Sequence, residues 1–276
     1  MCSLVGFVGT HSPLKTAKCL ILAGMTRGID AAGYCEINAQ GQYRIEKRAG
    51  HPIQFVQRMK FLLNPVTWLG HTRKATSDNA DQDCAAHPFN GQRFVVFHNG
   101  FLVKADQTRI RDMFGITSKN GVDSELFLAF LDKFGNIDSL KYLMLPFISD
   151  ESRYVLVIYD KCERKVHFIK DAHHPLVYRM TDAGFYYAST AEILQGGIDR
   201  RFITFDTIRK FPVVDFPSQG HLIVDICSGK IEKQDDCIKS VAFNSSPRYI
   251  NAVVDAPPPQ VVLDPCSGRE IKKGKN

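Results

Sequence analysis

The sequence has few of the features that mark a secreted, membrane-bound or metal-stabilised chain. Its 276 residues contain no apolar run near the roughly 20 residues that cross a bilayer. The first residues also lack the charged region and long apolar stretch of a signal peptide. The eight cysteines are scattered and form no CxxC pair, which favours reduced thiols over a disulfide framework. We therefore expect a cytoplasmic protein without membrane association.

Charge of one sign is also scarce in the body of the chain. The net charge is +6, and half of it comes from the final SGREIKKGKN, where four basic residues accompany one acidic residue. The remainder is only mildly basic, so nucleic-acid binding is not expected. From about residue 238 the composition changes to NSSP, DAPPPQ and the basic end, and the proline run favours extended chain. We predict one domain over 2–237 and a Pro-containing basic tail over 238–276.

Short runs rich in Val, Ile, Phe and Tyr are what the sequence has in abundance. Such runs predict strands at 3–9, 93–100, 153–160, 165–171, 176–181, 184–190 and 220–226. Helical character is found in 12–28, 51–63, 121–135 and 136–148. Clusters of strands interrupted by pairs of helices predict an α+β layered fold rather than a regular βαβ alternation.

Cys2 directly follows the initiator methionine. A thiol needs a nearby base or positive field to react at neutral pH. Removal of Met1 would give Cys2 a free α-amine beside its own thiol, and terminal nucleophiles activated in this way are known. Taken alone, however, a buried strand residue is the more frequent role of such a cysteine.

Arg73 stands among Thr72, Thr76 and Ser77 in LGHTRKATS. A planar guanidinium beside hydroxyl groups suits the capture of a small carboxylate, although an arginine that caps a loop is the simpler interpretation. Cys84, His87 and His98 could suggest zinc. No fourth ligand falls at a recognisable spacing, so we expect no metal site.

Asn99 and Gly100 end the run RFVVFHNG, and Asp123 precedes a predicted helix. An Asn amide with the N–H of the next Gly can form an oxyanion hole, yet in isolation Asn-Gly favours a hairpin turn. Asp123 can bind an ammonium group, yet in isolation it favours a helix N-cap. Together, a nucleophile, a carboxylate anchor, an oxyanion hole and an ammonium anchor fit an amino acid with an amide side chain. Glutamine fits.

Six stretches in this order carry a resemblance: CSLVG, RGIDAAG, LGHTRKAT, AHPF, VVFHNG and GVDSE. The chain resembles the class II glutamine amidotransferases, whose glutaminase domain is an N-terminal-nucleophile (Ntn) hydrolase. Within them it is most similar to the glutaminase domain of the glucosamine-6-phosphate synthases. The resemblance covers about residues 2 to 235 and implies a four-layer αββα sandwich.

The resemblance also implies roles for individual residues. Cys2 would be the nucleophile and its α-amine the base, with Asn99 and Gly100 as the oxyanion hole. Arg73 with Thr76 would hold the glutamine α-carboxylate, with Ser77 beside them, and Asp123 would hold the α-ammonium group. Arg27 and Gly28 would support the nucleophile, and no cofactor is implied. Lys74 stands where the synthases have a Trp.

The predicted function is therefore a glutaminase that hydrolyses L-glutamine through a Cys2 thioester and supplies ammonia to a separate synthase. One alternative is a γ-glutamyl amide hydrolase with water as the acceptor. An alternative from another class is a non-catalytic Ntn-fold module that binds an amino acid or a partner.

Overall fold

The computed structural model describes residues 1–10, 13–75, 81–198 and 211–235, and two antiparallel sheets run through them. The seven-stranded sheet has the strand order β11-β9-β10-β1-β4-β2-β3. Its strands are β1 (Ser3–Gly9), β2 (Ala31–Ile37), β3 (Tyr43–Ala49), β4 (Thr67–Arg73), β9 (Val177–Thr181), β10 (Gly184–Ala188) and β11 (Val214–Asp215). The strand that begins the chain is therefore central in its sheet, between β10 and β4.

The six-stranded sheet has the order β13-β12-β8-β7-β6-β5. Its strands are β5 (Phe89–Asn90), β6 (Phe94–Phe101), β7 (Arg153–Asp160), β8 (Lys165–Lys170), β12 (His221–Asp225) and β13 (Ile231–Asp235). Every pairing in both sheets is antiparallel. Strands paired in this way can follow one another through short turns, as β7 and β8 do.

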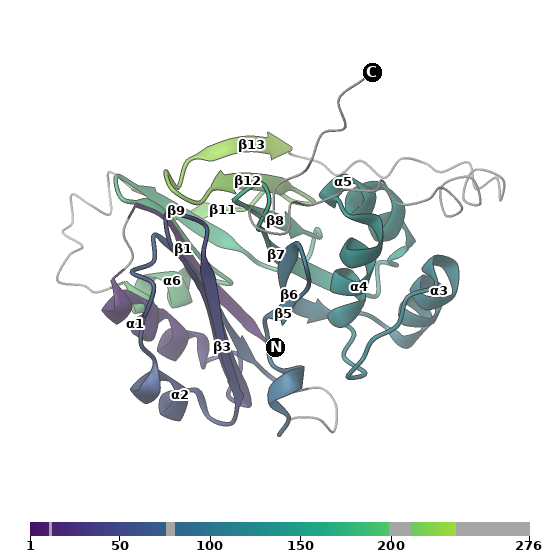
Figure 1. The fold of residues 1–276 in the computed structure, drawn as a ribbon, viewed down its shortest axis with the longest axis horizontal. Helices are drawn as coiled ribbons and strands as arrows, with labels where there is room; N and C mark the ends of the chain where they lie inside the picture. Colours follow the sequence, from purple (N-terminus) through teal and green to yellow (C-terminus); the bar gives the residue numbers. More distant parts are fainter. Residues whose placement is uncertain (11–12, 76–80, 199–210, 236–276) are drawn as a thin grey trace, which may run out of the picture.

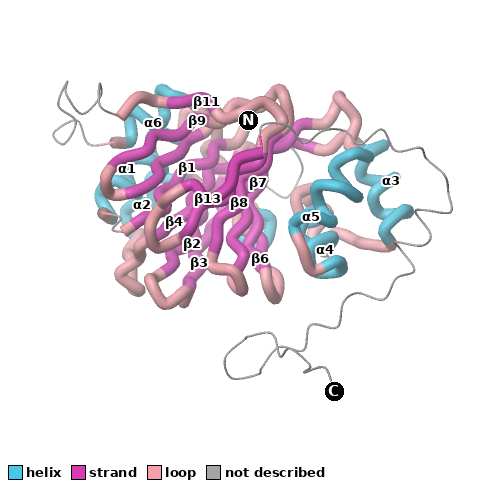
Figure 2. Tube along the Cα trace, turned by 90° about the horizontal axis from the view of Figure 1, so that it is seen from above, coloured by secondary structure: helices cyan, strands magenta, loops and turns pink. Residues whose placement is uncertain are grey.

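Helices cover the outer face of each sheet (Figures 1 and 2). The seven-stranded sheet is covered by α1 (Leu14–Gly24), α2 (Pro52–Arg58) and α6 (Ala191–Gly197). The six-stranded sheet is covered by α3 (Lys104–Phe114), α4 (Glu125–Phe134) and α5 (Ile137–Ser139), with a π-helical turn at Leu140–Met144 and a 3₁₀ turn at Leu145–Phe147. A further 3₁₀ turn, Asp83–Ala85, lies against β3 of the other sheet. The predicted four-layer αββα sandwich is confirmed. None of the helices in these residues has the length and apolarity to cross a membrane.

Three apolar layers hold the four layers of structure together. Leu4 and Val8 of β1 pack between the sheets, whereas Val5 and Phe7 of the same strand pack against α1 on the outer side. Successive strand residues point to opposite faces, so a strand covered on both sides must be apolar at almost every position. This explains why the run SLVGFVG is buried throughout.

The same alternation brings chemically active residues to one place. On β1 the even-numbered residues face the other sheet, so Cys2 continues the row of Leu4. On β6 the odd-numbered residues face inward, so Asn99 continues the row of Val95 and Phe97. On β4, Arg73 shares the inward face of Leu69. The sequence thus directs these three side chains into the space between the sheets.

The structure contains elements that the sequence did not predict. These are β2, β3, β4, the short β5 and β11, the edge strand β13, and the helices α3 and α6. The predicted helix over 136–148 is broken into three short turns, and Pro146 lies in the last of them. The predicted tail over 238–276 lies outside the described residues, so the domain boundary at 237 stays a prediction.

Candidate active site

Cys2 lies half-buried at the entry to β1, against the backbone of Lys74. The Lys74 N–H donates to Cys2 Sγ at 3.4 Å, and the thiol lies 3.7 Å from the Lys74 carbonyl oxygen. Arg27 donates from Nε to the Cys2 carbonyl oxygen at 2.8 Å and from Nη2 to Met1 Sδ at 3.4 Å. This direct contact with Cys2 supports the predicted role of Arg27 beside the nucleophile.

The Cys2 thiol is held in its neutral form. Burial raises its pKa, and this outweighs the Lys74 N–H, the terminal ammonium group and Arg73, all of which lower it. The Asp123 carboxylate raises the pKa further. Because burial keeps the proton on sulfur, a thiol in this position needs a base to accept that proton before it can attack.

Gly28 and Asp30 fix the segment that carries Arg73 and Lys74. A Cβ on Gly28 would lie 2.5–2.8 Å from the carbonyl group of Arg73 and the nitrogen of Lys74, closer than side-chain carbons approach. Asp30 donates from its N–H to the Arg73 carbonyl oxygen at 2.9 Å and accepts the Ala75 N–H at 2.7 Å. The sequence prediction named Gly28 but missed Asp30, although it stands in the same RGIDAAG stretch.

Arg73 ends β4, opposite Ala31 of β2, and only 4% of its surface is exposed. It acts on the thiol through its positive charge, which places it within electrostatic reach of Cys2. Its proposed companions Thr76 and Ser77 lie outside the described residues. The carboxylate-binding role of all three therefore stays a prediction.

Asn99 and Gly100 are strand residues and do not form a hairpin turn. They pair with Val155 and Tyr154 of β7, so the hairpin that an Asn-Gly pair suggests in isolation is wrong here. Gly100 has φ +149°, and a Cβ there would collide with the carbonyl group of Arg153. Only glycine fits this position, which explains why Asn99 is followed by a glycine inside the last residues of β6.

Asp123 does not cap α4. The helix begins at Glu125, with Ser124 in the cap position and no side-chain cap hydrogen bond. The Asp123 carboxylate instead accepts the Leu102 N–H at 2.7 Å and the Ser124 N–H at 2.8 Å. The helix-cap alternative is therefore wrong, because the carboxylate ties the start of α4 to the chain that leaves Asn99 and Gly100.

Three buried histidines lie behind this site. The rings of His71 and His87 are 4.2 Å apart, and His71 Nε2 donates to the His98 carbonyl oxygen at 3.2 Å. His98 Nε2 donates to the Arg153 carbonyl oxygen at 3.3 Å, so Nδ1 accepts from the Ser124 hydroxyl at 2.8 Å. Burial lowers the pKa of His71 to about 3 and lowers those of His87 and His98 as well. These histidines are neutral. His71 and His98 link neighbouring segments by hydrogen bonds, whereas His87 contributes ring packing, and neither of its ring nitrogens is paired within the described residues.

Ser189 is a site residue that the sequence prediction missed. It follows β10 and is completely buried. Its hydroxyl accepts the Leu4 N–H at 2.8 Å and lies 3.2 Å from Asn99 Nδ2. The strand run GFYYAST contains Ser189, but its partners are 185 and 90 residues away in the chain, so no local pattern reveals them.

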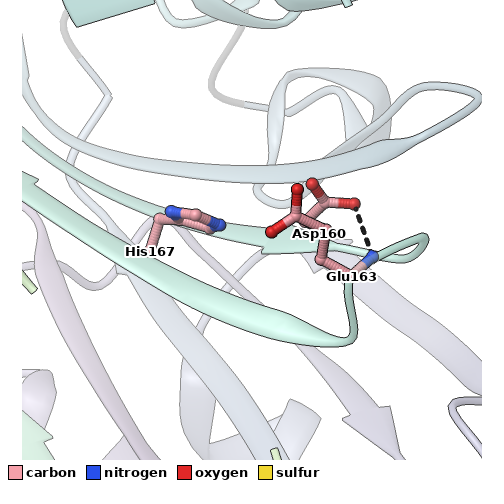
Figure 3. A group of neighbouring side chains, drawn as sticks. All are labelled: Asp160, Glu163 and His167. Atoms are coloured by element: carbon pink, nitrogen blue, oxygen red, sulfur yellow. Dashed lines mark hydrogen bonds between the residues drawn. The ribbon is translucent and has the colours of Figure 1, made fainter. Parts of the chain in front are cut away.

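A separate polar cluster lies on the outer face of the six-stranded sheet. Among the described residues, Asp160, Glu163 and His167 bring ligand atoms within 4.8 Å of one another (Figure 3). Arg93 occupies these carboxylates: it donates to both oxygens of Asp160 at 2.6–3.0 Å and to Glu163 at 3.2 Å. The Cys162 and Glu163 N–H groups also donate to Asp160. The cluster is therefore an ion-pair network centred on Arg93, and a cation would have to displace that arginine.

The layered fold and the thiol at the start of a central strand define the class: this is the architecture of the N-terminal-nucleophile hydrolases. No family model matches the chain. In sequence it is 26% identical, over 94% of its length, to the glutamine–fructose-6-phosphate aminotransferase (isomerizing) of Streptococcus pyogenes serotype M3. Over 69% of its own length, the chain is 25% identical to the enzyme of that name from Bacillus spizizenii. The chain spans only 43% and 32% of these two relatives.

Solved structures agree on the fold. A glutamine phosphoribosylpyrophosphate amidotransferase from B. subtilis matches 85% of this chain and 49% of its own, with a TM-score of 0.64 and 18% identity. A class-II glutamine aminotransferase domain protein from Silicibacter pomeroyi matches 86% of this chain and 99% of its own, with a TM-score of 0.50 and 13% identity. The chain is thus similar to the class II glutamine amidotransferases, as its ordered motifs predicted, and these relatives are enzymes of the predicted class.

Proposed function

We propose that this chain is a class II glutaminase domain that hydrolyses the side-chain amide of L-glutamine. The observation that carries the proposal is the position of Cys2, fixed at the entry to a central strand by Arg27 and Lys74. The charges of Arg73 and Asp123 both act on its thiol. One thiol, one cation and one carboxylate at the end of the inter-sheet layer suit a substrate that has an amide, a carboxylate and an ammonium group.

The reaction requires removal of Met1. In the described chain the nitrogen of Cys2 belongs to a peptide bond with Met1 and cannot accept a proton. A free α-amine ordinarily has a pKa near 7.7–8.0, so after removal of Met1 the amine of Cys2 can take the thiol proton. The thiolate then attacks the side-chain carbonyl carbon of glutamine and forms a tetrahedral oxyanion.

Asn99 and Gly100 stabilise the oxyanion in this proposal, and one such donor is worth about 2.7–4 kcal/mol. The ammonium group of Cys2 returns its proton to the departing nitrogen, which leaves as ammonia. Water, deprotonated by the same amine, then attacks the Cys2 thioester and releases glutamate. Arg73 and Asp123 hold the α-carboxylate and α-ammonium groups throughout.

The ammonia is proposed to serve an acceptor reaction in a synthase. The similarity to glutamine–fructose-6-phosphate aminotransferases supports this, since the chain matches less than half of their length. A γ-glutamyl amide hydrolase would use the same residues with water as the only acceptor. Turnover of glutamine, compared with that of N-substituted γ-glutamyl amides, distinguishes the two reactions.

Glutamate release by the purified protein tests the proposal. We expect hydrolysis of glutamine by the chain whose intact mass shows loss of Met1, and none by Cys2→Ala. A variant that keeps Met1 should be inactive although its thiol is present. Activity that survives in Cys2→Ala would refute the mechanism, and a processed but inactive wild type would favour the non-catalytic module.

A further inference from the structure

Ser189 joins the strand of the nucleophile to the residue proposed for the oxyanion hole. Its N–H donates to the Leu4 carbonyl oxygen at 2.9 Å, and its hydroxyl accepts the Leu4 N–H at 2.8 Å. These two bonds fix β1 two residues beyond Cys2. The same hydroxyl contacts the side-chain amide of Asn99. One buried oxygen therefore connects both halves of the proposed site.

The Asn99 amide is satisfied at only one end. Its Nδ2 donates to Ser189 Oγ at 3.2 Å, whereas Oδ1 is buried and meets no hydrogen-bond partner in the part of the chain that the structure describes. An unpaired buried acceptor costs about 1–3 kcal/mol. In this orientation the Ser189 hydroxyl accepts from both Leu4 and Asn99, and its own proton is used in neither bond.

A half-turn of the amide lets Oδ1 accept the unused Ser189 proton, and it leaves an unpaired donor where the unpaired acceptor was. The two ends of an Asn amide have nearly the same shape, so the rotation exchanges Nδ2 and Oδ1 and moves little else. The Ser189 hydroxyl can then donate to Oδ1 while it still accepts the Leu4 N–H. Nδ2 takes the position of the unpaired oxygen, and a donor without a protein partner is what a developing oxyanion requires.

We propose that Ser189 is a positioning residue that holds Asn99 in this turned orientation for catalysis. The proposal rests on the proposed glutaminase function. Its rival is a purely structural role, in which Ser189 only ties β1 to the end of β10. The two roles differ in which measured quantity changes when the hydroxyl is removed.

Steady-state kinetics of Ser189→Ala give the first readout. We expect kcat for glutamine to fall by about tenfold or more, up to the 10²–10³-fold that loss of an oxyanion donor causes. KM should stay within about twofold, because Arg73 and Asp123 still bind the substrate. Ser189→Thr keeps a hydroxyl and should recover most of the activity. Ser3→Ala is the matched control, since Ser3 Oγ of β1 is buried with no partner among the described residues.

Alkylation of Cys2 by iodoacetamide separates positioning from structural damage. The thiolate displaces iodide at a CH₂ carbon, so no oxyanion forms and Asn99 is not needed. We expect Ser189→Ala to be alkylated at the wild-type rate while its glutamine turnover falls. A displaced β1 would change both rates together, and that result would overturn the proposal.

A double-mutant cycle tests whether Ser189 acts through Asn99. Adding Ser189→Ala to Asn99→Ala should cause no further loss of kcat. Losses that multiply, or an unchanged kcat in Ser189→Ala, overturn the assignment while the proposed function stands. If Ser189→Ala does not fold, Ser189→Cys keeps the volume with a weaker donor and should lose kcat in the same way. A processed wild type that releases no glutamate overturns the proposed function and this assignment with it.

Discussion

The paired strands β6 and β7 carry polar residues at both ends, and the two ends are arranged in opposite ways. At one end Asn99 and Gly100 pair with Val155 and Tyr154, and the Asn99 oxygen is left without a partner among the described residues. At the other end, where Phe94 pairs with Asp160, Arg93 and two backbone N–H groups surround the Asp160 carboxylate.

The difference separates the proposed ligand site from a structural network. Buried polar groups in folded proteins are almost always paired, so an unpaired one needs an explanation, and for the Asn99 oxygen we propose a ligand that supplies the partner. The Asp160 end resembles a metal site in composition (Figure 3), yet Arg93 already forms ion pairs with both of its carboxylates. The Asp160 carboxylate is fully paired, although His167 Nε2 beside it is not, so the pairing of the Asp160 carboxylate and of the Asn99 oxygen, rather than residue type, distinguishes the two ends.

Low pH should destabilise the structure at both ends of the β6–β7 pair, and this is the largest effect we expect. Unfolded histidines titrate near pH 6.5, whereas burial lowers the folded pKa of His71 and His221 to about 3 and that of His167 to about 4. Between these values the unfolded chain binds more protons. The free energy of unfolding therefore falls as pH drops from 6.5 towards 4, by about 1.4 kcal/mol per pH unit for each histidine.

Urea unfolding at pH 7, 6 and 5 measures this slope. The variant His167→Gln should flatten it, whereas His51→Gln, at an exposed position, should leave it unchanged. A free energy of unfolding that is the same at pH 7 and pH 5 would contradict the prediction.

Removing the Asn99 amide should lower catalytic activity and leave the stability of the fold unchanged. Asn99→Ala is expected to lower kcat for glutamine about 10²–10³-fold, because one oxyanion donor is lost. Its melting temperature should stay near that of the wild type, since the residue leaves only Ser189 without one contact. Parallel kinetics and thermal melts provide the test, and a variant that unfolds but retains its kcat would reverse the comparison.

Removing the Asp160 charge should have the opposite effect, lowering stability and leaving catalytic activity unchanged. Asp160→Asn leaves the half-buried Arg93 with only the exposed Glu163 as a counter-charge, and we expect a loss of about 2–3 kcal/mol of stability with kcat unchanged. Glu163→Gln is the matched control, because Glu163 is 51% exposed and its ion pair with Arg93 should contribute less than about 1 kcal/mol. Equal losses of stability in the two variants would show that Asp160 is not the centre of the network.

The smallest predicted effect concerns the support of the nucleophile. Gly28→Ala should push back the Arg73–Lys74 backbone and lower kcat/KM about tenfold, because small displacements at a reacting group are costly. Gly196→Ala is the matched control: its added Cβ would meet Ala23 at an ordinary 3.8 Å. Equal kcat/KM values in the two variants would refute a role for the close packing at Gly28.

Much of the fold was predictable because its central strands are apolar and its motifs stand in a recognisable order. Strand β3, with the sequence YRIEKRA, was not predicted, because an edge strand needs little apolar surface. Strand β4 was missed because Gly70, His71 and Arg73 interrupt its apolar pattern. These strands exist through their pairing with β2, which a local pattern does not contain.

The site was predictable where a motif contains the reacting atom, and not where the contact is distant. Cys2, Asn99 and Asp123 stand in short recognisable stretches. Ser189 and Asp30 act through hydrogen bonds to residues that lie far from them in the chain, so the sequence around them shows an ordinary strand end and loop. Thr76 and Ser77 stay predictions, since they lie outside the described residues.

The central place of β1 sets an order of events during biosynthesis. Its neighbour β10 is translated about 180 residues later, so the first strand waits half-paired while most of the domain is made. Met1 is 69% exposed in the finished fold, but Arg27 donates hydrogen bonds to Met1 Sδ and to the Cys2 carbonyl oxygen, one on each side of the Met1–Cys2 peptide bond. An aminopeptidase that acts during translation meets an unfolded N-terminus, whereas one that acts after folding meets an N-terminus held by Arg27. Under the proposed mechanism, the fraction of active molecules in a cell would depend on how promptly Met1 is removed from each nascent chain, and we expect a fusion tag placed ahead of Met1 to give folded but inactive protein.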